Sequence, residues 1–226
     1  MVRIACTLLL GLSMMRLPAQ EVLRGEVRVD LEPVYGEYVD AIYPLDTESA
    51  HRRALEEAAL CYSAMIYGWS FEYDMGEPAR GIDEGFELSS LGTIPFGDQG
   101  LFVTDAQVRD RRLYLWTDYR LNEAQKRRMG IWKSGKVQTV QAIGHGPLGG
   151  PVEVADWLSI KKAALEDAAQ GAVRAMLQGS ARNRPKEVRG YIGLSRFPTY
   201  WMDAGQWAAG ARFRVEITEM VPFGAY

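Results

Sequence analysis

The sequence predicts an α+β protein built from two tandem strand–helix–strand–strand units, each with a helix packed on an antiparallel sheet. The 226 residues are 47% hydrophobic and 24% charged, which is ordinary globular composition and excludes a fibrous or wholly disordered chain. An alanine-rich helical segment occurs twice, and alternating strand patterns follow both copies. Together these observations predict the fold class.

The first residues have the pattern of a secretory signal peptide. Arg3 gives a positive start, Ile4–Met15 is an apolar run, and Arg16 closes it before a cleavage site after Ala19 or Gln20. The run is too short for a membrane-spanning helix. We therefore expect residues 1–19 to be removed and the protein to be periplasmic or otherwise exported. The alternative is an uncleaved N-terminal helix.

The internal repeat sets the expected domain boundaries. Arg53–Ala59 and Ala163–Ala169 share the pattern Ala-Leu-Glu-Glu/Asp-Ala-Ala at an offset of 110 residues, and the same offset relates Val27 to Val137. Glycine matches outside the helix make a chance match less plausible. We expect both copies to have the same strand order. The expected units cover residues 20–130 and 131–226.

Each unit is expected to open with a strand and to continue with the repeated helix. Helical spacing places Leu55 and Leu165 on faces that should be buried against the sheets. Thr47 or Ser49 is the expected N-cap of the first helix, and Gly68 its stop. The expected strands are residues 26–31, 86–94, 100–108, 113–119, 136–142, 188–194 and 211–220, with a short helix over 122–129.

This order of a strand, an alanine-rich helix, a glycine region and a meander resembles a known family. It is similar to exported bacterial domains of the flagellar assembly T N-terminal kind and to related small outer-membrane-associated lipoproteins. The resemblance implies a structural or assembly role without enzyme activity, and partners among flagellar or envelope proteins. It is carried by residues 53–68, 81–94, 102–108 and 112–119.

Motifs for catalysis or metal binding are not found. The two histidines, His51 and His145, are 94 residues apart and lack metal-ligand spacing. No Gly-x-Ser-x-Gly motif occurs. Cys61, the one cysteine after the signal peptide, lies among apolar helix residues and is expected to be a buried, inert thiol. We predict no catalytic residue, no metal and no cofactor.

A basic, aromatic segment is the strongest candidate for a binding surface. Residues 109–136 hold nine basic and three acidic side chains. The net charge of -3 and the expected export argue against a nucleic-acid partner. A protein interface and a solvated strand edge with aromatic residues in the core are both open. Strand alternation places the interface candidates on one exposed face: Arg112, Tyr114, Trp116 and Arg120.

Two further clusters leave a second function open. Six acidic residues lie within 72–87, and Trp201 and Trp207 belong to an aromatic, glycine-rich region. A concave pocket joining both clusters would indicate an exported binding or hydrolytic protein for cell-wall glycan or small-molecule ligands. The favoured function is a non-enzymatic scaffold or assembly protein. Peptidoglycan, the outer membrane and a second copy of the chain remain open as partners.

Overall fold

The computed structural model describes residues 21–33, 43–76, 81, 83–148, 157–178 and 185–222. The expected signal peptide therefore lies outside the described residues. Within them the α+β class is confirmed, with three α-helices and nine strands. No helix in the described ranges is long and apolar enough to cross a membrane. The helices are α1 (Thr47–Ile66), α2 (Glu123–Gly130) and α3 (Trp157–Gln178). The strands are β1 (Val22–Asp30), β2 (Trp69–Asp74), β3 (Gly85–Ser90), β4 (Leu101–Arg109), β5 (Arg112–Arg120), β6 (Gln138–His145), β7 (Pro185–Leu194), β8 (Thr199–Asp203) and β9 (Gln206–Pro222).

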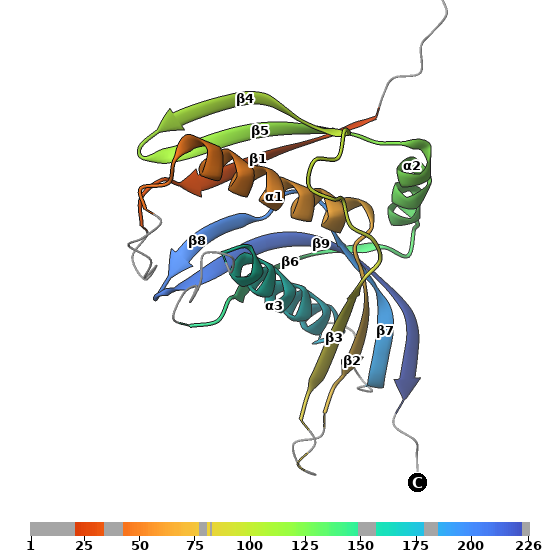
Figure 1. Cartoon of the computed structure of the whole chain (residues 1–226). Helices are drawn as coiled ribbons and strands as arrows, with labels where there is room; N and C mark the ends of the chain where they lie inside the picture. Colours follow the sequence, from red (N-terminus) through yellow and green to blue (C-terminus); the bar gives the residue numbers. More distant parts are fainter. Residues whose placement is uncertain are drawn as a thin grey trace, which may run out of the picture.

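The strands form two antiparallel sheets with α1 between them (Figure 1). A three-stranded sheet has the order β1-β5-β4. A six-stranded sheet has the order β3-β2-β7-β9-β6, and β8 pairs with β9 beside this path. Helix α3 packs on β6 and β9, and α2 follows β5. The molecule therefore has α1 as its central layer.

The expected repetition of one strand order is wrong. In the second half β9 lies between β6 and β7, whereas in the first half β5 lies between β1 and β4. Strand β2 of the first half pairs instead with β7 of the second half, with Trp69 opposite Ile192. In the first half β4 pairs with the second edge of β5, the position that β2 would hold if it matched β7 beside β9. Because the six-stranded sheet includes strands from both sides of residue 130, the halves are not separate helix-on-sheet units.

The helices keep the repeat better than the strands do. Helix α1 begins at Thr47 and α3 at Trp157, which reproduces the offset of 110 residues. The equivalence of Val27 and Val137 is not kept, because Val27 lies within β1 while Val137 precedes β6. The short helix expected over 122–129 is present as α2, with Asn122 as its N-cap.

The ends of α1 follow from local chemistry. Its N-cap is Asp46, whose carboxylate accepts a hydrogen bond from the Ser49 backbone N–H at 2.8 Å. The expected caps, Thr47 and Ser49, therefore lie one and three residues after the observed one. Gly68 follows the helix with a φ of 66°, a left-handed conformation that suits glycine. Chain reversal into β2 starts at this point.

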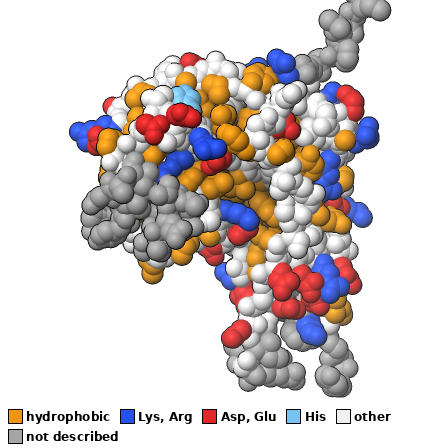
Figure 2. All heavy atoms as spheres, in the orientation of Figure 1, with side chains coloured by type: hydrophobic (Ala, Val, Ile, Leu, Met, Phe, Trp, Pro, Cys, Tyr) orange, Lys and Arg blue, Asp and Glu red, His pale blue; other side chains and the backbone are white. Residues whose placement is uncertain are grey.

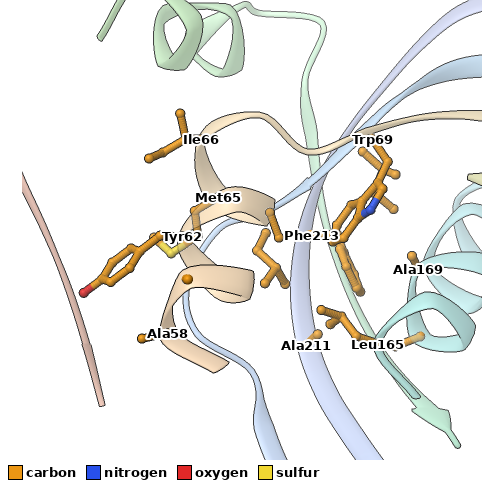
Figure 3. Close-up of a cluster of buried hydrophobic side chains, with 14 of the residues drawn as sticks. Ala58, Tyr62, Met65, Ile66, Trp69, Leu165, Ala169, Ala211 and Phe213 are labelled. Carbon is orange, nitrogen blue, oxygen red and sulfur yellow. The ribbon is translucent and has the colours of Figure 1, made fainter. Parts of the chain in front are cut away.

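One continuous core joins both halves (Figure 3). It includes Tyr62 and Ile66 of α1, Leu165 of α3 and Phe213 of β9. Leu165 is fully buried, as predicted. Leu55 is only partly buried, because α1 turns its alanines, Tyr62, Met65 and Ile66 toward the sheets instead.

Alanine and glycine let α3 approach its sheet closely. A Cβ added to Gly144 of β6 would lie 2.0 Å from the backbone nitrogen of Ala168. Ala164 and Ala168 are fully buried on the same helix face. The small side chains of the repeated segment therefore set the distance between the helix and the sheet.

Candidate functional site: a cleft beside β1

A cleft of about 760 Å³ lies between β1 and the segment that leads into β8. Its volume is in the range of ligand sites in proteins, roughly 300–1,000 Å³. Strand β1 lines it from Arg24 to Asp30, and the opposite wall runs from Arg196 to Met202. Helices α1 and α3 contribute Glu57 and Lys161. Elements of both halves therefore build the cleft.

A buried ion pair lies in the cleft. Lys161 Nζ is 2.6 Å from Glu57 Oε2, and both side chains are 6% exposed. The ammonium is also 5.0 Å from the ring centroid of Tyr200 and 4.8 Å from that of Trp207. Aromatic ring faces attract cations, and burial of an ion pair is tolerated only with good geometry. The pair and the rings hold one another in place.

Burial changes the acid–base behaviour of the groups around this pair. Desolvation raises the pKa of Glu57, and the neighbouring Lys161 opposes that rise. Burial also raises the pKa of the Cys61 thiol and of the Tyr200 phenol well above their ordinary values. Cys61 is therefore the buried, protonated thiol that was expected. Tyr200 Oη is buried without a hydrogen-bond partner among the described residues.

Ion pairs fix two arginines along the cleft. Arg112 Nε is 2.5 Å from Asp30 Oδ1, and Arg28 Nε is 2.7 Å from Glu26 Oε1. Arg196 is exposed and has no ion-pair partner within the described part of the chain. The lining has five basic side chains (Arg24, Arg28, Arg112, Lys161, Arg196) and three acidic ones (Glu26, Asp30, Glu57), hence a net charge of +2. The cleft is basic in a chain whose net charge is -3.

An aromatic wedge ties the far wall of the cleft to β1. The ring of Phe197 lies against Gly25, where an added Cβ would be 2.2 Å from Cζ of Phe197. Phe197 also packs edge-to-face on Tyr62, with 4.8 Å between ring centroids. The Tyr62 hydroxyl donates a hydrogen bond to the Thr117 carbonyl at 2.7 Å. Glycine at position 25 is therefore required for the segment before β8 to approach β1.

The interface candidates on β5 are only partly as expected. Arg112 and Arg120 are exposed, and Arg112 lines the cleft. Tyr114 is 8% exposed rather than exposed, because the guanidinium groups of Arg28 and Arg109 cover its ring at 5.5 and 4.2 Å from the centroid. The prediction that Tyr114 is exposed is therefore wrong.

The remaining two interface candidates are also held by their neighbours. Trp116 is half-buried and stacks on Tyr114, with 6.3 Å between ring centroids. The Arg120 guanidinium lies 4.4 Å from the ring centroid of Phe102. Arginine–aromatic stacks within the three-stranded sheet therefore occupy much of this face.

Among the described residues, the acidic segment and the tryptophans do not line a common pocket, and Glu77 of that segment lies outside them. Glu72 pairs with Arg189 at 3.2 Å on the six-stranded sheet, and Glu84 pairs with Arg174 of α3. Trp201 and Trp207 line the cleft instead. Strand β2 pairs with β7 and β3, whereas β8 pairs with the Gln206–Gly210 end of β9, which separates the clusters. Among the described residues, no His, Cys, Asp and Glu side chains group as a metal site.

A second, smaller hollow of about 300 Å³ lies between α1, α3 and the loop after β3. Its lining includes Leu60, Trp69, Ile94 and Phe96. Figure 2 shows hydrophobic side chains gathered near the middle of the face it presents. Glu56, Ser63 and Lys162 also line it, but the buried ion pair and the larger set of basic and aromatic groups lie in the cleft beside β1.

Sequence reasoning missed the buried ion pair and the wall of the cleft. Glu57 and Lys161 are 104 residues apart, and no motif links them. The available signal was a charged residue on the apolar face of each helix. The aromatic region around Trp201 was noted, but its neighbours along β1 depend on the chain topology.

A protein-family model matches residues 12–223, so the chain belongs to that family. An uncharacterized protein of Treponema pallidum (strain Nichols) is similar, with 23% identity over 171 residues. That alignment covers 76% of this chain and 69% of the relative. No solved structure matches the chain significantly.

Proposed function

We propose that the protein is a non-enzymatic, exported binding protein of a scaffold or assembly type, and that the cleft beside β1 is its binding site. The observation that carries this proposal is one 760 Å³ cleft in which a buried Lys161–Glu57 pair, aromatic rings and basic side chains converge. Export is proposed from the pattern of the first nineteen residues. Partners are proposed among envelope or flagellar proteins rather than nucleic acids.

The lining supports recognition of a partner. Arginine, tryptophan and tyrosine supply most of the binding energy at protein interfaces. In the cleft, Arg28 and Arg112 are held by carboxylates, so less side-chain freedom is lost on binding. Trp201 is 36% exposed and is available for contact. Such a preorganised, basic and aromatic surface fits a partner with acidic and apolar groups.

Comparison of co-purified proteins from the source cell tests this proposal. Arg196→Glu and Trp201→Ala should reduce recovery of specific partners, because both side chains line the cleft. The matched control is Arg127→Glu, an exposed arginine on α2 outside the cleft. Thermal unfolding should be the same for the three variants. Equal recovery with all three would contradict the proposal.

A glycan is the second candidate ligand, favoured because Trp201 and Trp207 line the same cleft as the carboxylates Glu26 and Asp30. Aromatic faces with nearby acidic groups are suited to sugar rings. Soluble glycan strands from peptidoglycan, free of peptide, are the probe. Saturable quenching of tryptophan fluorescence that Trp201→Ala abolishes would favour this function over protein binding.

A further inference from the structure

We propose that the cleft binds an acidic polypeptide segment in an extended conformation, added as a strand to the free edge of β1. This inference rests on the proposed function of the cleft and specifies its partner. Three independent properties of the described residues carry it: the pairing of the strands, the dimensions of the cleft and its charge.

Strand β1 has an unpaired edge where it borders the cleft. In the described structure β1 pairs with β5 alone, from Val22 opposite Arg120 to Asp30 opposite Arg112. Arg24, Glu26, Arg28 and Asp30 line the cleft from one face of β1, and Gly25, which has no side chain, lines it with its backbone. The edge of β1, with its backbone groups, therefore borders the space. Such an edge can accept a further strand.

The cleft has the dimensions of one extended chain. Six residue steps from Arg24 to Asp30 span about 20 Å at ~3.3 Å per residue. A volume of about 760 Å³ divided by that length gives a mean cross-section of ~38 Å². A strand in a packed sheet occupies ~48 Å², from a strand spacing of ~4.8 Å and a sheet spacing of ~10 Å. The cleft is therefore long enough for an extended heptapeptide, and because exposed residues such as Arg28 and Thr199 line it, part of the bound chain can remain in solvent.

Charge selects an acidic segment. Five basic and three acidic side chains line the cleft. Arg196 has no ion-pair partner in the described ranges, and Arg24 is 83% exposed with Asp118 at 3.7 Å. These two arginines are on opposite walls, so they can pair with carboxylates at both sides of a bound chain. Apolar side chains of that chain would meet the rings of Phe197 and Trp201.

The probe is a phage-displayed library of random heptapeptides, panned against the immobilised protein, with selected sequences then synthesised. We expect enrichment of Asp and Glu alternating with apolar residues. The double variant Arg24→Glu/Arg196→Glu should weaken binding by at least about tenfold, whereas Arg127→Glu should not. Selection of basic peptides, or of none above background, would overturn the inference.

Amide hydrogen exchange separates strand addition from other modes. Binding of a selected peptide should slow exchange of backbone amides between Arg24 and Asp30. In a second experiment, N-methyl groups are placed on either the odd or the even residues of the peptide. One of these two peptides should bind about tenfold more weakly, because only one set of residues bonds to β1. If cleft variants abolish binding but both of these effects are absent, strand addition fails and the binding site stands. If binding ignores the cleft variants, both proposals fail. If only peptide-free glycan strands bind, this inference and the proposal of protein partners both fail, and the cleft remains a glycan site.

Discussion

The two halves of the molecule share a helix but differ in what surrounds it. Helix α3 packs on β6 and β9 of one sheet, whereas α1 lies between two sheets. In the second half the strand after the helix, β7, joins β9; in the first half β2 leaves its own half and joins β7. Strand β1 is thereby left with one neighbour, and the cleft forms along its other edge. A repeated helix therefore does not imply a repeated sheet.

Corresponding helix positions show the same difference in chemistry. Glu57 of α1 corresponds to Asp167 of α3 at the offset of 110 residues. Glu57 is buried against Lys161, while Asp167 is exposed and accepts a hydrogen bond from the His145 backbone N–H. Because α1 is enclosed on both sides, Glu57 needs the partner Lys161. Asp167 is exposed to solvent and does not need one.

The largest expected effect comes from breaking the buried ion pair. Lys161→Met should lower the free energy of unfolding by about 3–5 kcal/mol, because it leaves Glu57 buried without its partner. The double variant Lys161→Met/Glu57→Leu should recover most of this loss. Urea denaturation measures both, with exposed Lys162→Met as the control. A double variant that is as unstable as the single one would show that the pair is not the cause.

The loss of stability in Lys161→Met should depend on pH. Desolvation raises the pKa of Glu57 in the folded state above its value in the unfolded chain. The folded state therefore holds the proton more tightly, so stability is present at low pH and is lost as pH rises through the folded pKa. The deficit of Lys161→Met should shrink as pH falls from 7 toward the unfolded value of 4.5. A deficit independent of pH would contradict a buried, unpaired carboxylate.

A pair of leucine variants compares the two helices at equivalent positions. Leu165→Ala should cost about 2–5 kcal/mol, since Leu165 is fully buried. Leu55→Ala should cost less, about 1 kcal/mol, because Leu55 is only partly buried. Urea denaturation of both variants checks the difference. Equal losses would show that α1 and α3 bury these equivalent leucines alike.

Alkaline pH should lower the stability of the protein, because the Cys61 thiol and the Tyr62 phenol of α1 are buried in their neutral, protonated forms. Burial raises the pKa of Cys61 above its ordinary 9.0 and that of Tyr62 above 10.0. The unfolded chain releases these protons at lower pH than the fold does, so stability falls as pH rises above about 9. Tyr62→Phe should flatten part of this decline in urea titrations. Stability that rises from pH 9 to 11 would contradict the buried environment.

The sequence predicted the helices and several strands because their signals are local. The repeated Ala-Leu-Glu pattern located α1 and α3, and alternation of Leu113 and Leu115 with polar and aromatic residues located β5. Strand β2 was not predicted, because its Glu72 and Asp74 were assigned to a turn-rich acidic segment. The short strand β8 was also missed.

The cleft could not be predicted because it depends on contacts between distant residues. The Phe197 ring lies where a side chain at position 25 would clash with it, and this contact joins the segment before β8 to the first half of the chain. Tyr114 was expected to be exposed, since alternation gives the face of a strand but not the arginines that cover it. Local pattern gave the elements, and topology determined the site.

Site-specific photo-cross-linking in the source cell tests most directly that the cleft beside β1 is a binding site. A photoreactive amino acid replaces Thr199, an exposed residue that lines the cleft, or Arg127 on α2 as the control. The account predicts a discrete cross-linked partner from position 199, absent from position 127 and lost when Arg24→Glu/Arg196→Glu is added. Cross-links that are equal at both positions, or that survive the double variant unchanged, would contradict it.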